Sequence, residues 1–212
     1  MAIVVIGGHT RNIGKTSVVC ALLSALPAYN WTAIKITQFG HNVCSANGKP
    51  CDCETADHAL AISEERNPTT GTDSSRFLAA GAARSLWVRT RQGQLAEAMP
   101  RIRAEIARSE NILFESNSIL RFLQPDFYAS VLHPAVADFK PSALRYLDRA
   151  HALLLSSAPP SASACEPSAA LPWPAVSHQW ITRIPTFRIA PPHYASPDFA
   201  AFVAKSLETK YL

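Results

Sequence analysis

The sequence predicts an α/β fold of three layers, in which a mainly parallel sheet is flanked by helices on both faces. Short apolar runs alternate with helix-like segments along the 212 residues, and this alternation is typical of parallel strands joined by crossover helices. Hydrophobic residues make up 48% of the chain and charged residues 17%, which favours a globular protein over a disordered one. At this length we expect a single domain, 1–212, with a full hydrophobic core.

The first half of the chain predicts a strand–helix–strand unit and then a long polar loop. An apolar run precedes a glycine-containing turn, and Gly81 follows a short helix as a typical C-terminal cap. The amphipathic segment 95–108 contains Pro100, which we expect to kink or divide the helix. The expected elements are strands 2–7, 31–37 and 84–89, helices 15–26, 73–80 and 95–108, and loop 38–71 with a helix over 54–66.

The second half continues the alternation, interrupted by one low-complexity segment. Residues 156–177 are rich in Ser, Ala and Pro, and we expect a flexible surface loop within the domain because a strand and a helix still follow. The expected elements are strands 111–115, 127–132, 152–155 and 186–189 and helices 141–149 and 197–207.

The turn after the first strand has the composition of a phosphate-binding loop. In such a loop, successive backbone N–H groups and the positive end of the following helix converge on one anion. We expect Lys15 to reach the outer phosphates of a nucleoside triphosphate and the Thr16 hydroxyl to bind Mg²⁺. The residues expected to bind the nucleotide are Thr10, Arg11, Asn12, Ile13, Gly14, Lys15, Thr16 and Ser17.

This turn departs from the strict Gly-x-x-x-x-Gly-Lys-Ser/Thr pattern at one position. The pattern needs glycine at position 9, where the chain has His9, and Gly8 comes one residue early. Asn12 tolerates a left-handed backbone, so it suits a tight loop. The alternative is an ordinary strand–turn–helix with a chance Gly-Lys-Thr, but the apolar strand before the turn and the apolar helix after it favour the phosphate loop. We expect His9 or Arg11 to touch the nucleotide.

Charged residues at the expected strand ends are the candidates for chemistry. Glu115 ends strand 111–115, and ligands of parallel sheets lie at the carboxyl ends of strands, so we expect it to approach Mg²⁺ directly or through water. The alternative is a helix cap or a solvated strand end. Lys35 lies inside a strand, which predicts contact with a phosphate or an acid, and Asp73 either caps a helix or helps to hold the metal. Lys15 and Glu115 are the expected catalytic residues.

Three cysteines form a cluster with a spacing suited to metal binding. Thiolates bind Zn²⁺ or iron–sulfur clusters, and a histidine can complete a four-ligand site. Incidental thiols in a loop, or a redox pair, are the alternatives. The candidate ligands are Cys44, Cys51 and Cys53 with His41 or His58.

Composition argues against two other classes of partner. The net charge is only +4 and no dense basic run occurs, so no nucleic-acid partner is predicted. No stretch approaches the ~18 consecutive apolar residues of a membrane span. The short first apolar run lacks a preceding basic region, so we expect no signal peptide and a cytoplasmic protein.

Several segments follow one another in an order found in a known family. They are the phosphate loop, then Ile34-Lys35-Ile36-Thr37, the Asp-Ser…Ala-Gly-Ala segment within 72–82, and Leu113-Phe114-Glu115. On these residues the chain resembles the molybdopterin-guanine dinucleotide biosynthesis protein B family of small P-loop NTPases, as a divergent member. The resemblance implies a three-layer α/β fold, Mg²⁺-dependent binding and slow hydrolysis of GTP or ATP, a homodimer, and a supporting role with a client protein in molybdenum-cofactor assembly.

The chain also departs from this family. Ser116 replaces the glycine that follows the family's strand-end glutamate, Asn117 comes next, and the cysteine segment is an insertion. No Asn-Lys-x-Asp guanine signature occurs, so the base stays open. One alternative function is a small-molecule kinase or ATP-dependent ligase akin to dethiobiotin synthetase, in which Lys35 and Glu115 would face an acceptor. Another is a nucleotide-regulated binding module in which the cysteines hold a metal and hydrolysis is only a timer.

Overall fold

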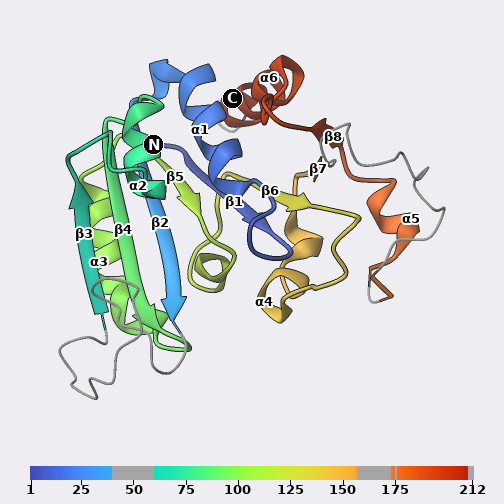
Figure 1. The fold of residues 1–212 in the computed structure, drawn as a ribbon, viewed down its shortest axis with the longest axis horizontal. Coiled ribbons are helices and arrows are strands. Elements are labelled where there is room, and N and C mark those ends of the chain that lie inside the picture. Colours follow the sequence, from blue (N-terminus) through green and yellow to red (C-terminus); the bar gives the residue numbers. More distant parts are fainter. Residues whose placement is uncertain (40–59, 157–172, 175, 210–212) are drawn as a thin grey trace.

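One mostly parallel sheet organises the molecule. The computed structural model describes residues 1–39, 60–156, 173–174 and 176–209. Within these residues, eight strands form a single sheet in the order β3-β4-β2-β5-β1-β6-β7-β8 (Figure 1). Neighbouring strands are parallel throughout, except that β3 runs antiparallel to β4. The predicted three-layer α/β class with a mainly parallel sheet is confirmed.

The elements follow the predicted alternation closely. The strands are β1 (Ile3–Gly8), β2 (Trp31–Phe39), β3 (Leu60–Glu65), β4 (Arg84–Arg91), β5 (Asn111–Glu115), β6 (Phe127–Leu132), β7 (Ala152–Ser156) and β8 (Thr186–Ile189). The α-helices are α1 (Lys15–Ala25), α2 (Asp73–Ala79), α3 (Leu95–Ala107), α4 (Pro141–Leu144), α5 (His178–Ile181) and α6 (Pro197–Glu208), and the 3₁₀ turns are η1 (Pro27–Tyr29), η3 (Ser118–Arg121) and η4 (Leu147–Arg149). In the described part of the chain, no helix has the length and apolar character needed to cross a membrane.

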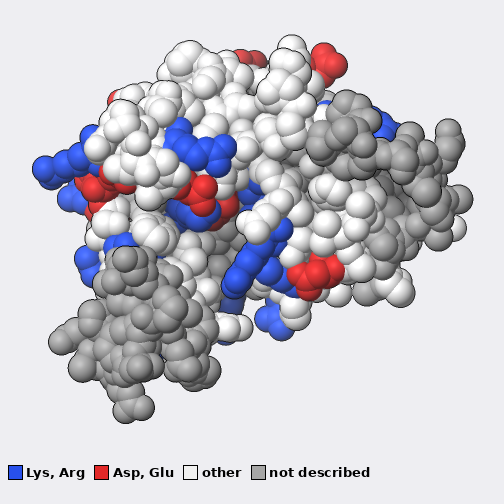
Figure 2. All heavy atoms as spheres, viewed as in Figure 1, with Lys and Arg blue, Asp and Glu red and all other residues white. Residues whose placement is uncertain are grey.

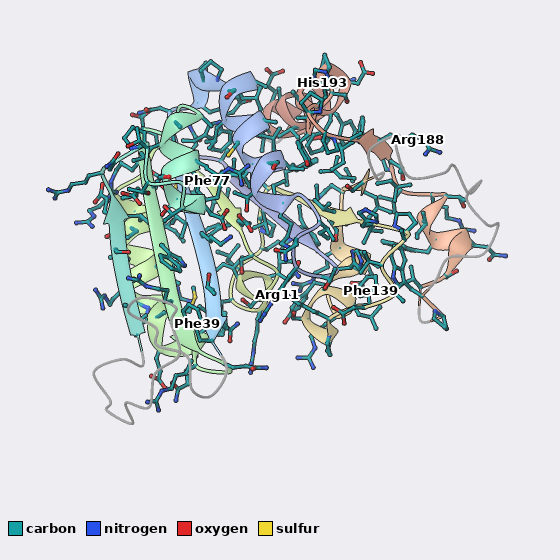
Figure 3. All side chains as sticks on the ribbon, in the orientation of Figure 1. Arg11, Phe39, Phe77, Phe139, Arg188 and His193 are labelled. Carbon is teal, nitrogen blue, oxygen red and sulfur yellow. The ribbon has the colours of Figure 1, made fainter. Side chains whose placement is uncertain are left out.

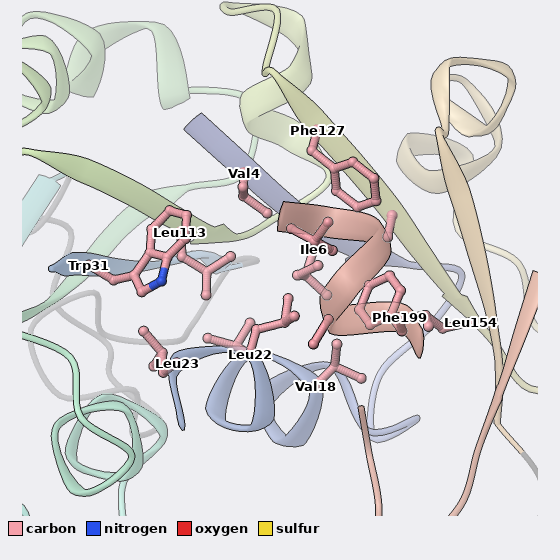
Figure 4. Close-up of a cluster of buried hydrophobic side chains, with 14 of the residues drawn as sticks. Val4, Ile6, Val18, Leu22, Leu23, Trp31, Leu113, Phe127, Leu154 and Phe199 are labelled. Atoms are coloured by element: carbon pink, nitrogen blue, oxygen red, sulfur yellow. The ribbon is translucent and has the colours of Figure 1, made fainter. Parts of the chain in front are cut away.

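Two hydrophobic clusters, one on each face of the sheet, make up the core. On the first face α1, α2 and α6 pack on the central strands, with Val18 and Phe199 among the buried side chains (Figure 4). On the second face α3, α5 and the 3₁₀ turns η3 and η4 pack on the same strands. Side chains of β1 alternate between the two clusters, with Val4 in the first and Val5 in the second. A strand buried on both faces therefore appears in the sequence as a continuous apolar run.

Local capping residues set the helix ends that the sequence predicted. The Thr72 side chain caps α2 by accepting a hydrogen bond from the Ser75 N–H, and Ser196 caps α6 in the same way through Phe199. Gly81 follows α2 with φ +101°, a left-handed backbone that favours glycine, so the predicted stop is confirmed.

The predicted helix over 54–66 is wrong in its described part. Residues 60–65 form strand β3, which pairs antiparallel with β4 so that Ile62 lies opposite Val88. Leu60 and Ile62 both pack on the second cluster, and this two-residue period is that of a strand covering a core. Sheet pairing at the edge of β4 therefore decides the conformation. Of the loop predicted over 38–71, positions 38 and 39 belong to β2 and 60–65 to β3, whereas 66–71 form a loop as predicted.

Two proline-related predictions also need correction. The α3 helix is not divided at Pro100, because a buried face that includes Leu95, Met99 and Ile102 outweighs one missing backbone donor; the alternative of a kink stays a prediction. The predicted helix 141–149 is instead two short pieces, α4 and η4.

The end of the predicted surface loop 156–177 belongs to the core. Residues 157–172 and 175 lie outside the described residues, but Trp173 is 2% exposed and packs in the second cluster. Its indole Nε1 donates a hydrogen bond to the Val136 carbonyl at 2.8 Å. Trp173 therefore ties the chain before α5 to the segment after β6.

The α6 core contact supplies a stability prediction. Phe199 is fully buried against Phe127 and Phe187, with ring centroids 6.2 and 5.2 Å away. We expect Phe199→Ala to lower the free energy of unfolding by about 3–5 kcal/mol, because it removes buried area and leaves a cavity. Leu144→Ala, at an exposed position, should change it by about 0.5 kcal/mol or less. Urea unfolding of both variants checks this, and equal losses would contradict the placement of α6.

Candidate functional site

The turn between β1 and α1 lies at the carboxyl edge of the sheet, and Figure 3 labels its Arg11. Its backbone is left-handed at two positions, Asn12 with φ +56° and Gly14 with φ +96°. A Cβ at Gly14 would also lie 2.7 Å from the Tyr194 ring, so glycine is needed here for both space and conformation. Asn12 thus adopts the left-handed backbone that the sequence analysis expected it to tolerate.

Unpaired backbone donors are concentrated in this turn. The N–H groups of residues 10–17 find no acceptor among the residues that the structure describes, and Gly14 caps α1 without any side-chain hydrogen bond. Free N–H groups at the positive end of a helix form an anion-binding concavity. A chain of phosphate oxygens is a ligand that such a concavity can hold.

The Lys15 ammonium lies within the same concavity. Its Nζ donates to the Thr10 carbonyl across the turn. Burial lowers the pKa of Lys15 to about 8, and the positive charges of Lys140 and Lys35 act in the same direction against the opposing effect of Glu115. The site therefore holds a cation that lacks enough negative charge, which favours an anionic ligand.

Glu115 joins three elements at the end of β5. Its carboxylate is 6% exposed and accepts hydrogen bonds from Thr16 Oγ1 at 2.8 Å and from Lys35 Nζ at 3.0 Å. In the sheet register Glu115 lies opposite Ile6 of β1 and Lys35 of β2. The alternatives of a helix cap or a solvated strand end are therefore excluded.

Lys35 bridges two carboxylates, those of Glu115 and Asp73. Burial alone would lower the pKa of Lys35, but both carboxylates outweigh it and raise that pKa above its ordinary value. Burial likewise opposes ionisation of Asp73, yet the hydrogen bond from Lys35 lowers the pKa of that carboxyl. The sequence alternative of Asp73 as a helix cap is wrong, because Thr72 caps α2 and Asp73 is its first helical residue. Acidic and basic side chains lie side by side near the middle of the face shown in Figure 2.

The oxygen atoms near the start of α1 are of the type that binds a magnesium ion. Thr16, Glu115 and Asp73 supply the hydroxyl and carboxylate oxygens that Mg²⁺ prefers. The ammonium of Lys35 contacts both carboxylates, so the two acids are already held close together around a cation.

His9, one of the two residues predicted to touch the nucleotide, has its ring packed in the core beside the turn. Its ring is fully buried and packs against Phe139 and Trp173, with centroids 5.2 and 4.9 Å away. Its Nε2 lies 3.3 Å from the Val136 carbonyl, and burial is the main reason that the pKa of His9 is lowered. Arg11 is exposed, so of the two side chains only that of Arg11 lies at the surface of the turn.

The segment 133–140, which follows β6, supports the turn from one side and was missed in the sequence. Thr10 donates to the Asp138 carboxylate, and the Lys140 N–H donates to the His9 carbonyl at 2.9 Å. These contacts join residues about 130 positions apart, so no local pattern reveals them. On the other side, the Arg76 guanidinium of α2 donates to Ser17 Oγ at 3.0 Å.

The predicted cysteine site lies outside the described residues. Cys44, Cys51, Cys53, His41 and His58 all fall within 40–59. Among the residues that are described, no group of three or more His, Cys, Asp or Glu side chains is arranged to hold a metal ion. The zinc or iron–sulfur interpretation therefore stays a prediction.

Comparisons with known proteins give distant structural likenesses. No protein-family model and no curated protein matches the sequence. The structure is similar to that of HypB from Helicobacter pylori in complex with nickel, with a TM-score of 0.49 and 13% identity over 98% of this chain and 88% of that one. It is also similar to LpxK from Aquifex aeolicus in complex with ATP, with a TM-score of 0.48 and 15% identity over 89% of this chain and 53% of that one.

The bridge at Lys35 supplies a second stability prediction. We expect Lys35→Met to lower the free energy of unfolding by about 3 kcal/mol, because it leaves the buried Glu115 carboxylate without its cation. The double variant Lys35→Met, Glu115→Gln should recover part of that loss.

Arg84 offers a matched control, since it also bridges two carboxylates, Glu64 and Glu105, but at a more exposed place. Arg84→Met should cost about 1 kcal/mol or less. Urea unfolding at neutral pH compares the variants. An equal loss of unfolding free energy at positions 35 and 84 would contradict a larger contribution from the Lys35 ion pairs.

Proposed function

We propose that this chain is a P-loop nucleoside triphosphatase that binds ATP or GTP with Mg²⁺ in the turn between β1 and α1. The observation that carries the proposal is the run of free N–H groups over residues 10–17, with a partly buried ammonium beside them. The binding residues would be Thr10, Arg11, Asn12, Ile13, Gly14, Lys15, Thr16 and Ser17.

Together with Mg²⁺, groups of the turn and of β5 would support slow phosphoryl transfer to water. Lys15 would exchange its contact with the Thr10 carbonyl for the outer phosphates and would stabilise the charge that develops there, together with the loop N–H groups. Thr16 and Glu115 would hold Mg²⁺, which when bound neutralises phosphate charge. Glu115 would also orient a water molecule, while Lys35 keeps that carboxylate in place.

We further infer that hydrolysis supports assembly of a metal cofactor similar to the molybdenum cofactor, with a client protein and as a homodimer. The ordered motifs shared with the molybdopterin-guanine dinucleotide biosynthesis protein B family support this proposal. In it, Cys44, Cys51 and Cys53 with His41 or His58 would hold zinc or an iron–sulfur cluster. Metal analysis of protein purified anaerobically tests this, and less than stoichiometric zinc or iron would contradict it.

The kinase or ligase alternative needs Lys35 and Glu115 to face an acceptor. In the structure Lys35 is instead bound by Asp73 and Glu115, which supports hydrolysis without a second substrate. We therefore expect phosphate release from MgATP or MgGTP in the absence of any acceptor. Turnover only after an acceptor is added would favour the kinase.

Removing the Lys15 ammonium should slow hydrolysis by about 10²–10³-fold, the effect of losing one donor to the transition state. Lys15→Ala is the test variant, and phosphate release is the measurement. Lys205→Ala, an exposed lysine of α6, is the control and should keep the wild-type rate. If Lys15→Ala hydrolysed at that rate too, the proposed site would be wrong.

The lowered pKa of Lys15, about 8, predicts a pH dependence of nucleotide binding. The charged form binds phosphate, so affinity should be constant well below pH 8 and fall as the ammonium deprotonates. We expect a loss of roughly tenfold between pH 7 and pH 9. Titration calorimetry with a MgATP analogue measures this, and a Lys15→Arg variant should show a flatter profile because arginine stays charged. A flat wild-type profile would contradict the prediction.

A further inference from the structure

Asn117 contacts the phosphate loop with both ends of its side-chain amide. It lies two residues after Glu115, where the chain leaves β5. Its Oδ1 accepts a hydrogen bond from the Gly8 N–H at 2.9 Å, and its Nδ2 donates to the Gly8 carbonyl at 2.8 Å. The side chain therefore pairs with Gly8 as a backbone neighbour would.

This pairing continues the β1–β5 ladder beyond its last backbone bond. The Ser116 N–H donates to the Ile6 carbonyl at 3.1 Å, and the Asn117 side chain then takes the next places along β1. A Cβ on Gly7 would lie 2.1 Å from Asn117 Oδ1. The Tyr128 ring would lie 2.9 Å from the same Cβ, so glycine at position 7 leaves room for both the Asn117 amide and the Tyr128 ring.

The other side of the same turn is held by β6. Gly8 lies opposite Val131 in the sheet register, and the His9 N–H donates to the Val131 carbonyl at 3.1 Å. Gly8 is therefore fixed between Asn117 and β6 immediately before the free N–H groups begin.

We propose that Asn117 is a positioning residue that holds the start of the phosphate loop in its anion-binding shape and keeps it in register with Glu115. The inference rests on the proposed function for its effect on nucleotide, but its effect on the loop is measurable without one.

The chemistry of the pair requires an amide. An ionised aspartate at position 117 would accept from the Gly8 N–H but would face the Gly8 carbonyl without a proton to share. It would also add negative charge beside bound phosphate.

The same strand provides a matched control. Asn111 begins β5, where its Oδ1 accepts from the Ala2 N–H at 2.6 Å and its Nδ2 donates to the Tyr29 carbonyl at 2.6 Å. It makes the same kind of double contact with backbone, but at the opposite edge of the sheet. Asn111→Asp therefore reports the cost of breaking such a pair away from the site.

The experiment compares Asn117→Asp and Asn111→Asp by urea unfolding, by amide hydrogen exchange of the peptide spanning residues 7–16, and by calorimetry with a MgATP analogue at neutral pH. Both variants should lose stability. Only Asn117→Asp should speed exchange of the Gly8 and His9 amides, which are the hydrogen-bonded ones at the start of the loop, and it should weaken binding by about tenfold.

Equal exchange and equal affinity in the two variants would overturn the positioning role. If the wild-type protein bound no nucleotide while Asn117→Asp still loosened the loop, the positioning role would stand and the proposed function would fail.

Discussion

The carboxylate of Glu115 is the point at which the main elements of the site meet. It accepts from Thr16 at the start of α1 and from Lys35 of β2, and Lys35 in turn pairs with Asp73 of α2. Because β5 lies between β1 and β2, a strand that ends on an acid brings a helix start and a lysine to one place. The order of strands in the sheet thus creates the charge arrangement on which the rest depends.

That arrangement leaves the two lysines with opposite properties. Lys35 has two carboxylates and a raised pKa, whereas burial lowers the pKa of Lys15 to about 8 despite the opposing charge of Glu115. The charge of Lys35 is therefore already neutralised by protein carboxylates, whereas the charge of Lys15 is only partly compensated. A cation that is left partly unsatisfied is able to gain energy on binding, while a paired one serves to fix its neighbours.

Much of the fold and of the candidate site was predictable from residue patterns, because apolar alternation and the Gly-Lys-Thr turn are local signals. They gave the parallel sheet, the position of Glu115 and the proximity of Lys35 to an acid. The strand β3 was missed, since its conformation depends on pairing with β4, which no periodicity over 54–66 revealed. The roles of His9, Asp138 and Asn117 were missed for a related reason: each side chain contacts a group about 110 to 130 positions away in the sequence.

The antiparallel direction of β3 has a topological consequence. Phe39 at the end of β2 lies opposite Arg91, and Leu60 at the start of β3 lies opposite Thr90, so both flank the last residues of β4. The two described residues that flank positions 40–59 therefore lie at one margin of the sheet, the same margin that carries Lys15 and Glu115. A parallel strand beside β4 would instead begin at the opposite margin.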